Sequence, residues 1–275
     1  MCNDCGCGVP DQHRVHSTSG PRIDATLRQR APSVIQMVGD LLSANNNDAR
    51  HNREHFEQHQ VLAINLMSSP GAGKTALLEA TIDLIGSELA IGVIEGDLET
   101  ENDANRIRAK GVPAVQITTG NACHLDAVMV HDALHHLDLD KLDVVFIENV
   151  GNLVCPAAFD LGQHFNVALL SVTEGDDKPA KYPVMFRSSD LVIVTKTDLL
   201  PHLDDFSLQR AEAALRSSGF GGPLLETTVR QPDGLAGWTG WLRQTALARR
   251  QPRKPLSRPA EHQHRHPATA AGQTP

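Results

Sequence analysis

The segment SSPGAGKT, residues 68–75, constrains the fold of this 275-residue chain more than any other stretch. It follows the apolar run VLAINLM and precedes ALLEATIDLI, whose apolar residues recur at helical spacing. A glycine-rich turn between a strand and a helix is typical of a phosphate-binding loop, in which backbone N–H groups surround a phosphate. A chance glycine-rich turn is the alternative, which the flanking strand and helix disfavour.

This interpretation assigns roles within the loop. Lys74 contacts the β- and γ-phosphates, and the hydroxyl of Thr75 holds Mg²⁺. Ser68 stands where the motif has its first glycine, and we expect a small residue at a strand end to make the same turn. The residues predicted to surround the phosphates are Gly71, Ala72, Gly73, Lys74, Thr75 and Ala76. The loop therefore predicts a nucleotide triphosphatase fold.

After residue 60, short apolar runs alternate with connections of helical length. Such runs are typical of parallel strands that are covered on both faces. We therefore expect a doubly wound α/β domain with a mostly parallel sheet over residues 60–248. The expected strands are 61–68, 90–97, 113–119, 143–149, 165–172, 190–197 and 223–229.

The two ends of the chain differ from this domain in composition. Residues 1–22 are polar and contain Gly, Pro and Ser, which predicts a flexible arm. Residues 23–59 show a helical pattern that is broken or weakened near ANNND, at 44–48. Residues 249–275 are rich in Pro, Ala and charge, which predicts a disordered tail.

The composition narrows the class of partner. A net charge of −8 argues against a protein that binds nucleic acid or an anionic membrane, because such binding depends on clustered Lys and Arg. The chain has no run of about 18 apolar residues and no signal-peptide pattern. We therefore expect a cytoplasmic location, where closely spaced cysteines bind metal or do redox chemistry more often than they form disulfides.

Two acidic residues end predicted strands beside the phosphate loop. Asp97 ends IEGD and Glu148 lies in VVFIEN, so both are expected to hold Mg²⁺ together with Thr75, directly or through water. Gly151 follows Glu148 and is a candidate N–H donor to the γ-phosphate. The predicted catalytic residues are Lys74, Thr75, Asp97 and Glu148. Solvated acids in strand-end turns are the alternative.

The segment TKTD, residues 195–198, resembles the guanine-reading motif NKxD with Thr in place of Asn. The carboxylate of Asp198 suits guanine, which presents N1–H and an amine, whereas adenine presents an acceptor at N1. Lys196 is expected to lie along the base, and the missing Asn is expected to remove one link to the phosphate loop. GTP is thus the expected nucleotide, with ATP as the alternative. Asp198 as a helix N-cap is the structural alternative.

The five cysteines form two groups. Cys123 and His124 are adjacent before a predicted helix, and Cys155 lies beyond Gly151, so the three form a candidate site for Zn²⁺ or Ni²⁺. Because Cys155 belongs to the loop expected to sense the γ-phosphate, nucleotide state and metal affinity are expected to be linked. Small buried hydrophobes are the alternative for these cysteines. The other group, in the arm, is Cys2, Cys5 and Cys7.

Seven segments in order resemble the HypB family, the GTPases of hydrogenase nickel incorporation: MCNDCGCG, NLMSSPGAGKT, IEGDLET, TTGNACHLDA, FIENVGNLVCPAAFDLG, DDKPAKYP and TKTDLLP. The resemblance extends from the first residues to about Leu242. It implies a slow, SIMIBI-like P-loop GTPase that delivers Ni²⁺ to the large subunit of [NiFe]-hydrogenase. It also implies a homodimer formed through the G domain and cooperation with HypA, the small zinc-containing nickel chaperone.

The resemblance also implies roles for individual residues. Matches to the family's phosphate, Mg²⁺ and guanine positions are Lys74, Thr75, Asp97, Glu148 and Asp198. Matches to the metal site and the apolar contact at the dimer interface are Cys123, His124, Cys155, Leu199 and Leu203. Cys2, Cys5 and Cys7 match a separate nickel site that also uses the terminal amine, a donor set that suits tetragonal Ni²⁺. A redox CxxC or reactive thiols are the alternatives for this group.

The 14 histidines leave a further question open. The groups His51, His55, His59 and His262, His264, His266 are candidates for nickel storage or simply solvated side chains. His131 and His135 are interpreted as surface residues. Three functions remain: nucleotide-gated nickel delivery, nickel storage without gating, and urease-type nickel insertion.

Overall fold

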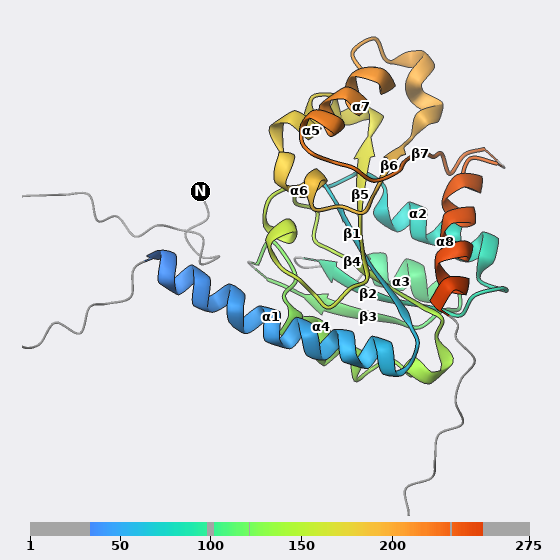
Figure 1. The fold of residues 1–275 in the computed structure, drawn as a ribbon. Helices are drawn as coiled ribbons and strands as arrows, with labels where there is room; N and C mark the ends of the chain where they lie inside the picture. The colour runs from blue at the N-terminus through green and yellow to red at the C-terminus, as the bar shows by residue number, and fades with distance from the viewer. Residues whose placement is uncertain (1–33, 98–101, 121, 232, 250–275) are drawn as a thin grey trace, which may run out of the picture.

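The computed structural model describes residues 34–97, 102–120, 122–231 and 233–249 (Figure 1). The predicted arm with its three cysteines, and all of the predicted tail except Arg249, including its three histidines, lie outside these residues. Their metal-binding roles therefore stay predictions.

One sheet of seven parallel strands forms the centre of the molecule, in the order β3-β2-β4-β1-β5-β6-β7. Its strands are β1 (Leu62–Ser68), β2 (Ile91–Asp97), β3 (Ala114–Thr118), β4 (Val144–Glu148), β5 (Phe165–Ser171), β6 (Leu191–Thr195) and β7 (Leu224–Glu226). Strands β1 and β4 are buried along their whole length. The strand order reverses direction at these two central strands. Their carboxyl ends lie at the edge of the sheet where doubly wound folds bind ligands. The doubly wound parallel sheet is confirmed.

Helices cover both faces of the sheet because alternate residues of each strand point to opposite faces. One face packs against α2 (Lys74–Ile85), α3 (Asn102–Ala109) and α8 (Ala236–Arg249). The other packs against α1 (Val34–Gln58), α4 (Ala127–Leu134), α6 (Pro183–Arg187) and α7 (Leu208–Ser217), with the short α5 (Lys178–Lys181) before α6. Within the described ranges, no helix has both the length and the apolar character that crossing a membrane requires.

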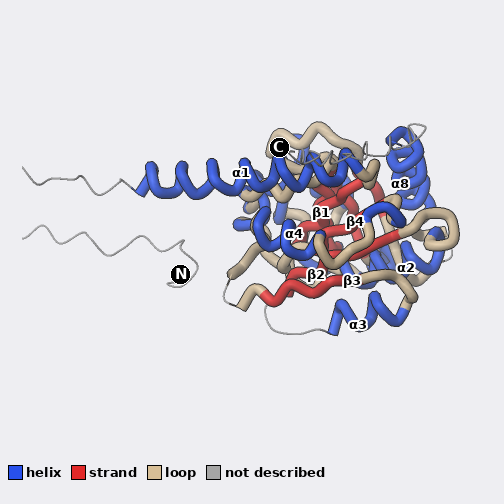
Figure 2. Tube along the Cα trace, turned by 90° about the horizontal axis from the view of Figure 1, so that it is seen from below, coloured by secondary structure: helices blue, strands red, loops and turns tan. Residues whose placement is uncertain are grey.

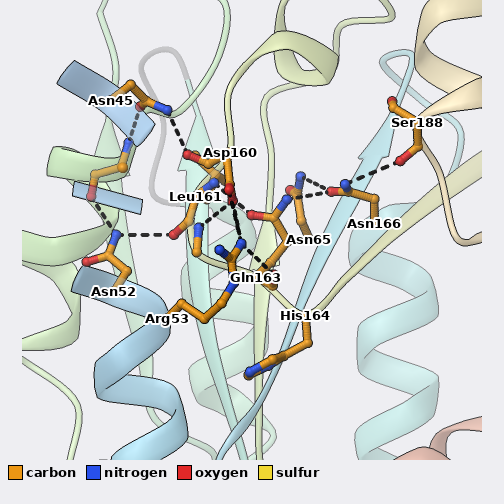
Figure 3. Close-up of polar contacts among 12 residues, drawn as sticks. Asn45, Asn52, Arg53, Asn65, Asp160, Leu161, Gln163, His164, Asn166 and Ser188 are labelled. Carbon is orange, nitrogen blue, oxygen red and sulfur yellow. Dashed lines mark hydrogen bonds and ion pairs between the residues drawn. The ribbon is translucent and has the colours of Figure 1, made fainter. Parts of the chain in front are cut away.

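Helix α1 runs unbroken through residues 44–48, so the predicted interruption is wrong. Asparagine is a weak helix former. In α1, however, the side chains of two asparagines donate hydrogen bonds to backbone carbonyls outside the helix. The Nδ2 of Asn45 donates to the carbonyl of Asp160 at 2.8 Å, and that of Asn52 donates to the carbonyl of Leu161 at 3.1 Å (Figure 3). Tertiary hydrogen bonds therefore hold the helix where local propensity is low.

The carboxyl-terminal part of α1 lies beside α4, while its first turns extend beyond the rest of the described chain (Figure 2). Phe56 of α1 is fully buried in the apolar cluster that also contains α4. At the same end, Arg249 donates to the carboxylate of Glu57 at 2.6 Å. Arg249 is the last residue of α8, one residue beyond the expected end of the domain. Helix α1 is thus packed on the G domain.

Candidate functional site

The phosphate loop joins β1 to α2 as expected. Gly71 has a φ of 76° and Gly73 a φ of 101°, left-handed conformations that favour glycine. Gly73 is the N-cap residue of α2, so the helix begins directly at the turn. The first N–H groups of a helix have no partner within it, which makes this end of α2 suited to an anion.

Ser68 replaces the first glycine of the motif without strain. The left-handed non-glycine residues of the described chain are Gln60 and Lys196, so Ser68 does not need glycine's freedom. Its hydroxyl accepts a hydrogen bond from the Nζ of Lys74 at 3.2 Å, and Lys74 is largely buried. The serine therefore orients the lysine of the loop.

A carboxylate pair lies beside Thr75. The hydroxyl of Thr75 donates to the Oε1 of Glu148 at 2.9 Å, and Glu148 is paired across the sheet with Glu95 of β2. Both glutamates are almost fully buried, and the Oε2 atom of each has no hydrogen-bond partner. Glu95 was not predicted from the sequence, although an acidic residue inside the apolar strand IGVIEGD was a visible signal.

The environment of this pair favours a bound proton. Burial, followed by the neighbouring Glu148 carboxylate, raises the pKa of Glu95 to about 11. Burial also raises the pKa of Glu148, against the opposing charge of Lys74. Without a cation, the two carboxyl groups therefore hold a proton at neutral pH. Their unpartnered buried oxygens suit a hard divalent ion such as Mg²⁺, whose charge would displace that proton.

The phosphate loop, Thr75 and the two glutamates line one cavity of about 380 Å³. Asp97 and Gly151, both predicted from the sequence, line this cavity, and Glu95 and Asn149 join them. Gly151 lies so close to the phosphate loop that a Cβ atom there would be 2.9 Å from the Cα of Pro70. The loop after β4 therefore borders the phosphate loop directly.

A second cavity of about 230 Å³ adjoins the first at Gly73 and Ala76, and Lys196 and Asp198 line it. The hydroxyl of Thr228 donates to the Oδ1 of Asp198 at 2.6 Å, which orients the carboxylate. Asp198 is not a helix N-cap, because it lies in the first turn of the 3₁₀ helix Thr197–His202, whose N-cap is Lys196.

The expected loss of a link to the phosphate loop is wrong. Thr195 stands in the place of the motif's Asn, and its hydroxyl donates to the carbonyl of Ala72 at 2.7 Å. The Nζ of Lys196 donates to the carbonyl of Gly71 at 2.7 Å. Thr195 and Lys196 of the TKTD segment therefore both hydrogen-bond to the backbone of the phosphate loop.

The structure brings Cys123, His124 and Cys155 together. The Sγ atoms of the two cysteines lie 2.8 Å apart, and the Nδ1 of His124 lies 3.8 Å from the Sγ of Cys123. Neither cysteine is in a disulfide, and all three residues are half-buried. The ring of His124 stacks on Phe159 with centroids 3.9 Å apart, and burial lowers the pKa of His124, which favours the neutral, ligating imidazole. Two thiols and an imidazole suit Zn²⁺ or Ni²⁺.

Asn149 ties this cluster to the phosphate cavity, a link that the sequence did not reveal. Its Oδ1 accepts from the N–H groups of Leu125 at 3.2 Å and Val150 at 3.0 Å, and the residue is buried. Farther along the same loop, the Oδ1 of Asn152 accepts from the N–H of Cys155 at 3.4 Å. Residues 149–155 thus join the phosphate cavity to the thiol of Cys155, a candidate metal ligand.

Other predicted residues have different surroundings. Leu199 and Leu203 are half-buried and pack against the core cluster around α6 and α7. The Nδ1 of His59 lies 2.8 Å from a carboxylate oxygen of Asp140. His135 is exposed, as predicted, whereas His131 is half-buried, and both lie beside His51 and His55 of α1.

Comparisons with known proteins agree with this geometry. The family model of the CobW/HypB/UreG nucleotide-binding domain matches residues 62–219. The hydrogenase maturation factor HypB of Azotobacter vinelandii is 48% identical over 233 residues, which are 83% of this chain and 75% of the relative. The hydrogenase/urease maturation factor HypB of Helicobacter hepaticus is 48% identical over 206 residues, 74% of this chain and 84% of the relative.

A solved structure extends the likeness to three dimensions. HypB from Helicobacter pylori, crystallised in complex with nickel, matches with a TM-score of 0.72 and 39% sequence identity. The match covers 76% of this chain and 97% of that chain. The phosphate loop, the carboxylates at the strand ends and the Cys-His-Cys cluster therefore lie on a shared fold, and the chain belongs to the HypB family of hydrogenase maturation factors.

Proposed function

We propose that this chain is a GTP-hydrolysing nickel metallochaperone that delivers Ni²⁺ to the large subunit of [NiFe]-hydrogenase and couples metal release to its nucleotide state. One observation carries the proposal: residues 149–155 border the phosphate cavity at one end and supply Cys155 at the other. A change in the γ-phosphate at Gly151 therefore has a short covalent path to a metal ligand. The relatives' roles in hydrogenase maturation and the nickel held by the H. pylori protein support this assignment.

The nucleotide chemistry follows from the two adjoining cavities. Asp198, oriented by Thr228, accepts from the N1–H and amine of guanine, while the phosphates lie on the glycine-rich turn beside Lys74. Thr75, Glu148 and Asp97 hold Mg²⁺ directly or through water. The bound ion neutralises phosphate charge, and we expect slow hydrolysis.

The metal chemistry uses the thiol cluster. Cys123, His124 and Cys155 bind Ni²⁺ or Zn²⁺, and the arm thiols Cys2, Cys5 and Cys7 hold a separate nickel ion. A homodimer forms through the G domain, with Leu199 and Leu203 at the contact, and HypA works with it in the cytoplasm. Nucleic acids and membranes are not partners.

Nickel binding in defined nucleotide states tests the proposal. The nickel affinity and dissociation rate of the full chain are measured with GDP, GTP and a non-hydrolysable GTP analogue, always with Mg²⁺. We expect weaker retention in one nucleotide state than in the others. Identical affinities and rates in all states would leave a nickel-storage protein without gating.

Urease-type nickel insertion is the second candidate, because the H. hepaticus relative is named for both hydrogenase and urease maturation. Deletion of the gene separates the two. We expect a hydrogenase defect that excess Ni²⁺ partly repairs. Loss of urease activity with unchanged hydrogenase activity would reverse the assignment.

A further inference from the structure

Four imidazole rings meet where α1 packs against α4. His51 and His55 are one turn apart on α1, and His131 and His135 are one turn apart along α4 and its C-cap. The ring centroid of His131 lies 5.0 Å from that of His51, 5.5 Å from that of His55 and 4.7 Å from that of His135. His131 is thus the centre of the cluster, and the two helices lie side by side there (Figure 2).

A buried asparagine sets the proton on the central ring. The Nδ2 of Asn52 donates to the carbonyls of Ala127 at 2.7 Å and Leu161 at 3.1 Å, so its Oδ1 points the other way. This Oδ1 lies 3.0 Å from the Nδ1 of His131 and accepts a hydrogen bond from the Nδ1–H group. The neutral ring therefore carries its lone pair on Nε2. Metal-binding histidines are commonly oriented in this way, by a partner that accepts from the other ring nitrogen.

The lone-pair nitrogen of His131 lies within hydrogen-bond distance of a ring nitrogen of His135, a contact that an ion bound between the two rings would replace. The Nε2 of His131 lies 3.2 Å from the Nε2 of His135. Two nitrogens on one tetrahedral zinc ion are about 3.3 Å apart, because each metal–nitrogen bond is about 2.05 Å long. The same geometry places the centroids of two ligating imidazoles roughly 5 Å apart. The separations around His131 are close to that value.

The charge state of His55 also suits a cation. Burial, followed by the nearby imidazoles of His51, His131, His59 and His135, lowers the pKa of His55. Neutral imidazoles present lone pairs, whereas protonated ones would repel one another across the helix interface. Among the described residues, Cys123, His124 and Cys155 are the one group whose ligand atoms all lie within 4.8 Å of each other. The imidazole cluster must therefore rotate its outer rings to close around an ion, and His51 and His135 are exposed enough to do so.

We propose that His51, His55, His131 and His135 form a further metal site, which binds a divalent transition-metal ion such as Ni²⁺ or Zn²⁺ between α1 and α4. Imidazole nitrogens suit both ions. The site is separate from the thiol cluster and does not depend on the nucleotide chemistry proposed above. It joins α1 to the helix that begins three residues after His124, so an ion here would stabilise the packing of α1 on the G domain.

The test compares three versions of the full chain in a background in which all five cysteines are replaced by serine, which removes both thiol sites. His51→Gln with His135→Gln removes two exposed ligands, and His136→Gln is the matched control on the neighbouring residue. Nickel and zinc equivalents are measured by equilibrium dialysis, and melting temperatures are measured with and without each metal. The tail histidines are common to all versions.

We expect the background protein and His136→Gln to bind one more equivalent than the double variant does, and to gain melting temperature on adding metal. The double variant should lose that equivalent and most of that gain. Equal metal equivalents in all three would overturn the proposal. So would a lower metal-free melting temperature of the double variant with unchanged metal binding, since the rings would then only pack the helices together. If the double variant does not fold, His51→Gln alone must lower the metal affinity at least tenfold.

Discussion

The two clusters of metal-ligating side chains differ in how the chain assembles them. Cys123, His124 and Cys155 lie on loops at the carboxyl edge of the sheet, where Asn149 connects them to the phosphate cavity. The imidazole cluster lies between the flanks of two helices that are packed by buried apolar residues. Strand-end loops respond to a ligand at the same edge, whereas packed helices keep their positions. We therefore expect nucleotide to control only the thiol cluster.

The largest effect should come from removing the thiols of the loop site. In a background with Cys2, Cys5 and Cys7 replaced by serine, Cys123→Ser with Cys155→Ser replaces two soft donors by weak ones, so we expect the nickel equivalent of this cluster to bind at least about 100-fold more weakly. The imidazole equivalent should be unchanged. Nickel titration, followed by thiolate-to-nickel charge-transfer absorbance and by total metal, measures both. Loss of both equivalents together would break the distinction between the two clusters.

A smaller effect should follow from replacing Glu95, which borders the phosphate cavity. Folded Glu95 keeps its proton up to its raised pKa of about 11, whereas unfolded Glu95 ionises above its ordinary pKa of 4.5. The folded state thus binds more protons between these pH values, and the free energy of unfolding of the metal-free protein falls as pH rises through this window. Glu95→Gln reduces that fall and should raise the free energy of unfolding by roughly 1–3 kcal/mol at pH 8.

Urea unfolding between pH 5 and pH 9 measures this effect, with the exposed Glu54→Gln as the control. The same Glu95→Gln variant should bind Mg²⁺ and GTP more weakly, because it offers one carboxylate fewer to the cation. Equal pH slopes for the variant and the wild type would mean that Glu95 is not held protonated in the fold.

The smallest effect should come from removing the hydrogen bond by which Asn149 connects the phosphate cavity to the thiol cluster. Asn149→Ala removes the acceptor for the N–H of Leu125, so we expect the dependence of nickel affinity on nucleotide to fall by roughly 0.5–2 kcal/mol, about two- to thirtyfold. Competition titrations with GDP and with a GTP analogue measure that dependence. Asn47→Ala, on the exposed side of α1, is the control. An undiminished dependence would show that the coupling runs through residues 150–155 alone.

Local signals in the sequence predicted the thiol cluster and only the α1 part of the imidazole cluster, because His51 and His55 were candidates for nickel storage whereas His131 and His135 were not. The strand, glycine turn and helix around Lys74 are contiguous, and Cys123 and Cys155 both follow strands of one parallel sheet, so topology alone brings them together. The imidazole cluster joins residues about 80 positions apart through the packing of α1 on α4, which no local pattern encodes. His131 therefore looked like a surface residue.

Side-chain hydrogen bonds explain the remaining differences. Asn45 looked like a helix interrupter because asparagine competes with the helix backbone, but here the side chains of Asn45 and Asn52 donate to carbonyls of another segment. Thr195, in place of asparagine, was expected to lose a contact with the phosphate loop, but its hydroxyl donates a hydrogen bond to that loop. Glu95 lay hidden in an apolar strand, and its importance depends on Glu148 lying opposite.

The central claim is that the nickel held by the thiol cluster responds to the nucleotide, and stopped-flow spectroscopy under single-turnover conditions tests it most directly. Protein with nickel at Cys123, His124 and Cys155, and with the arm cysteines replaced by serine, is mixed with GTP and Mg²⁺ in the presence of a nickel chelator. We predict that the thiolate-to-nickel absorbance decays at the rate of GTP hydrolysis, and that a non-hydrolysable analogue does not reproduce this decay. Decay at one rate with GTP, the analogue or no nucleotide would contradict the account.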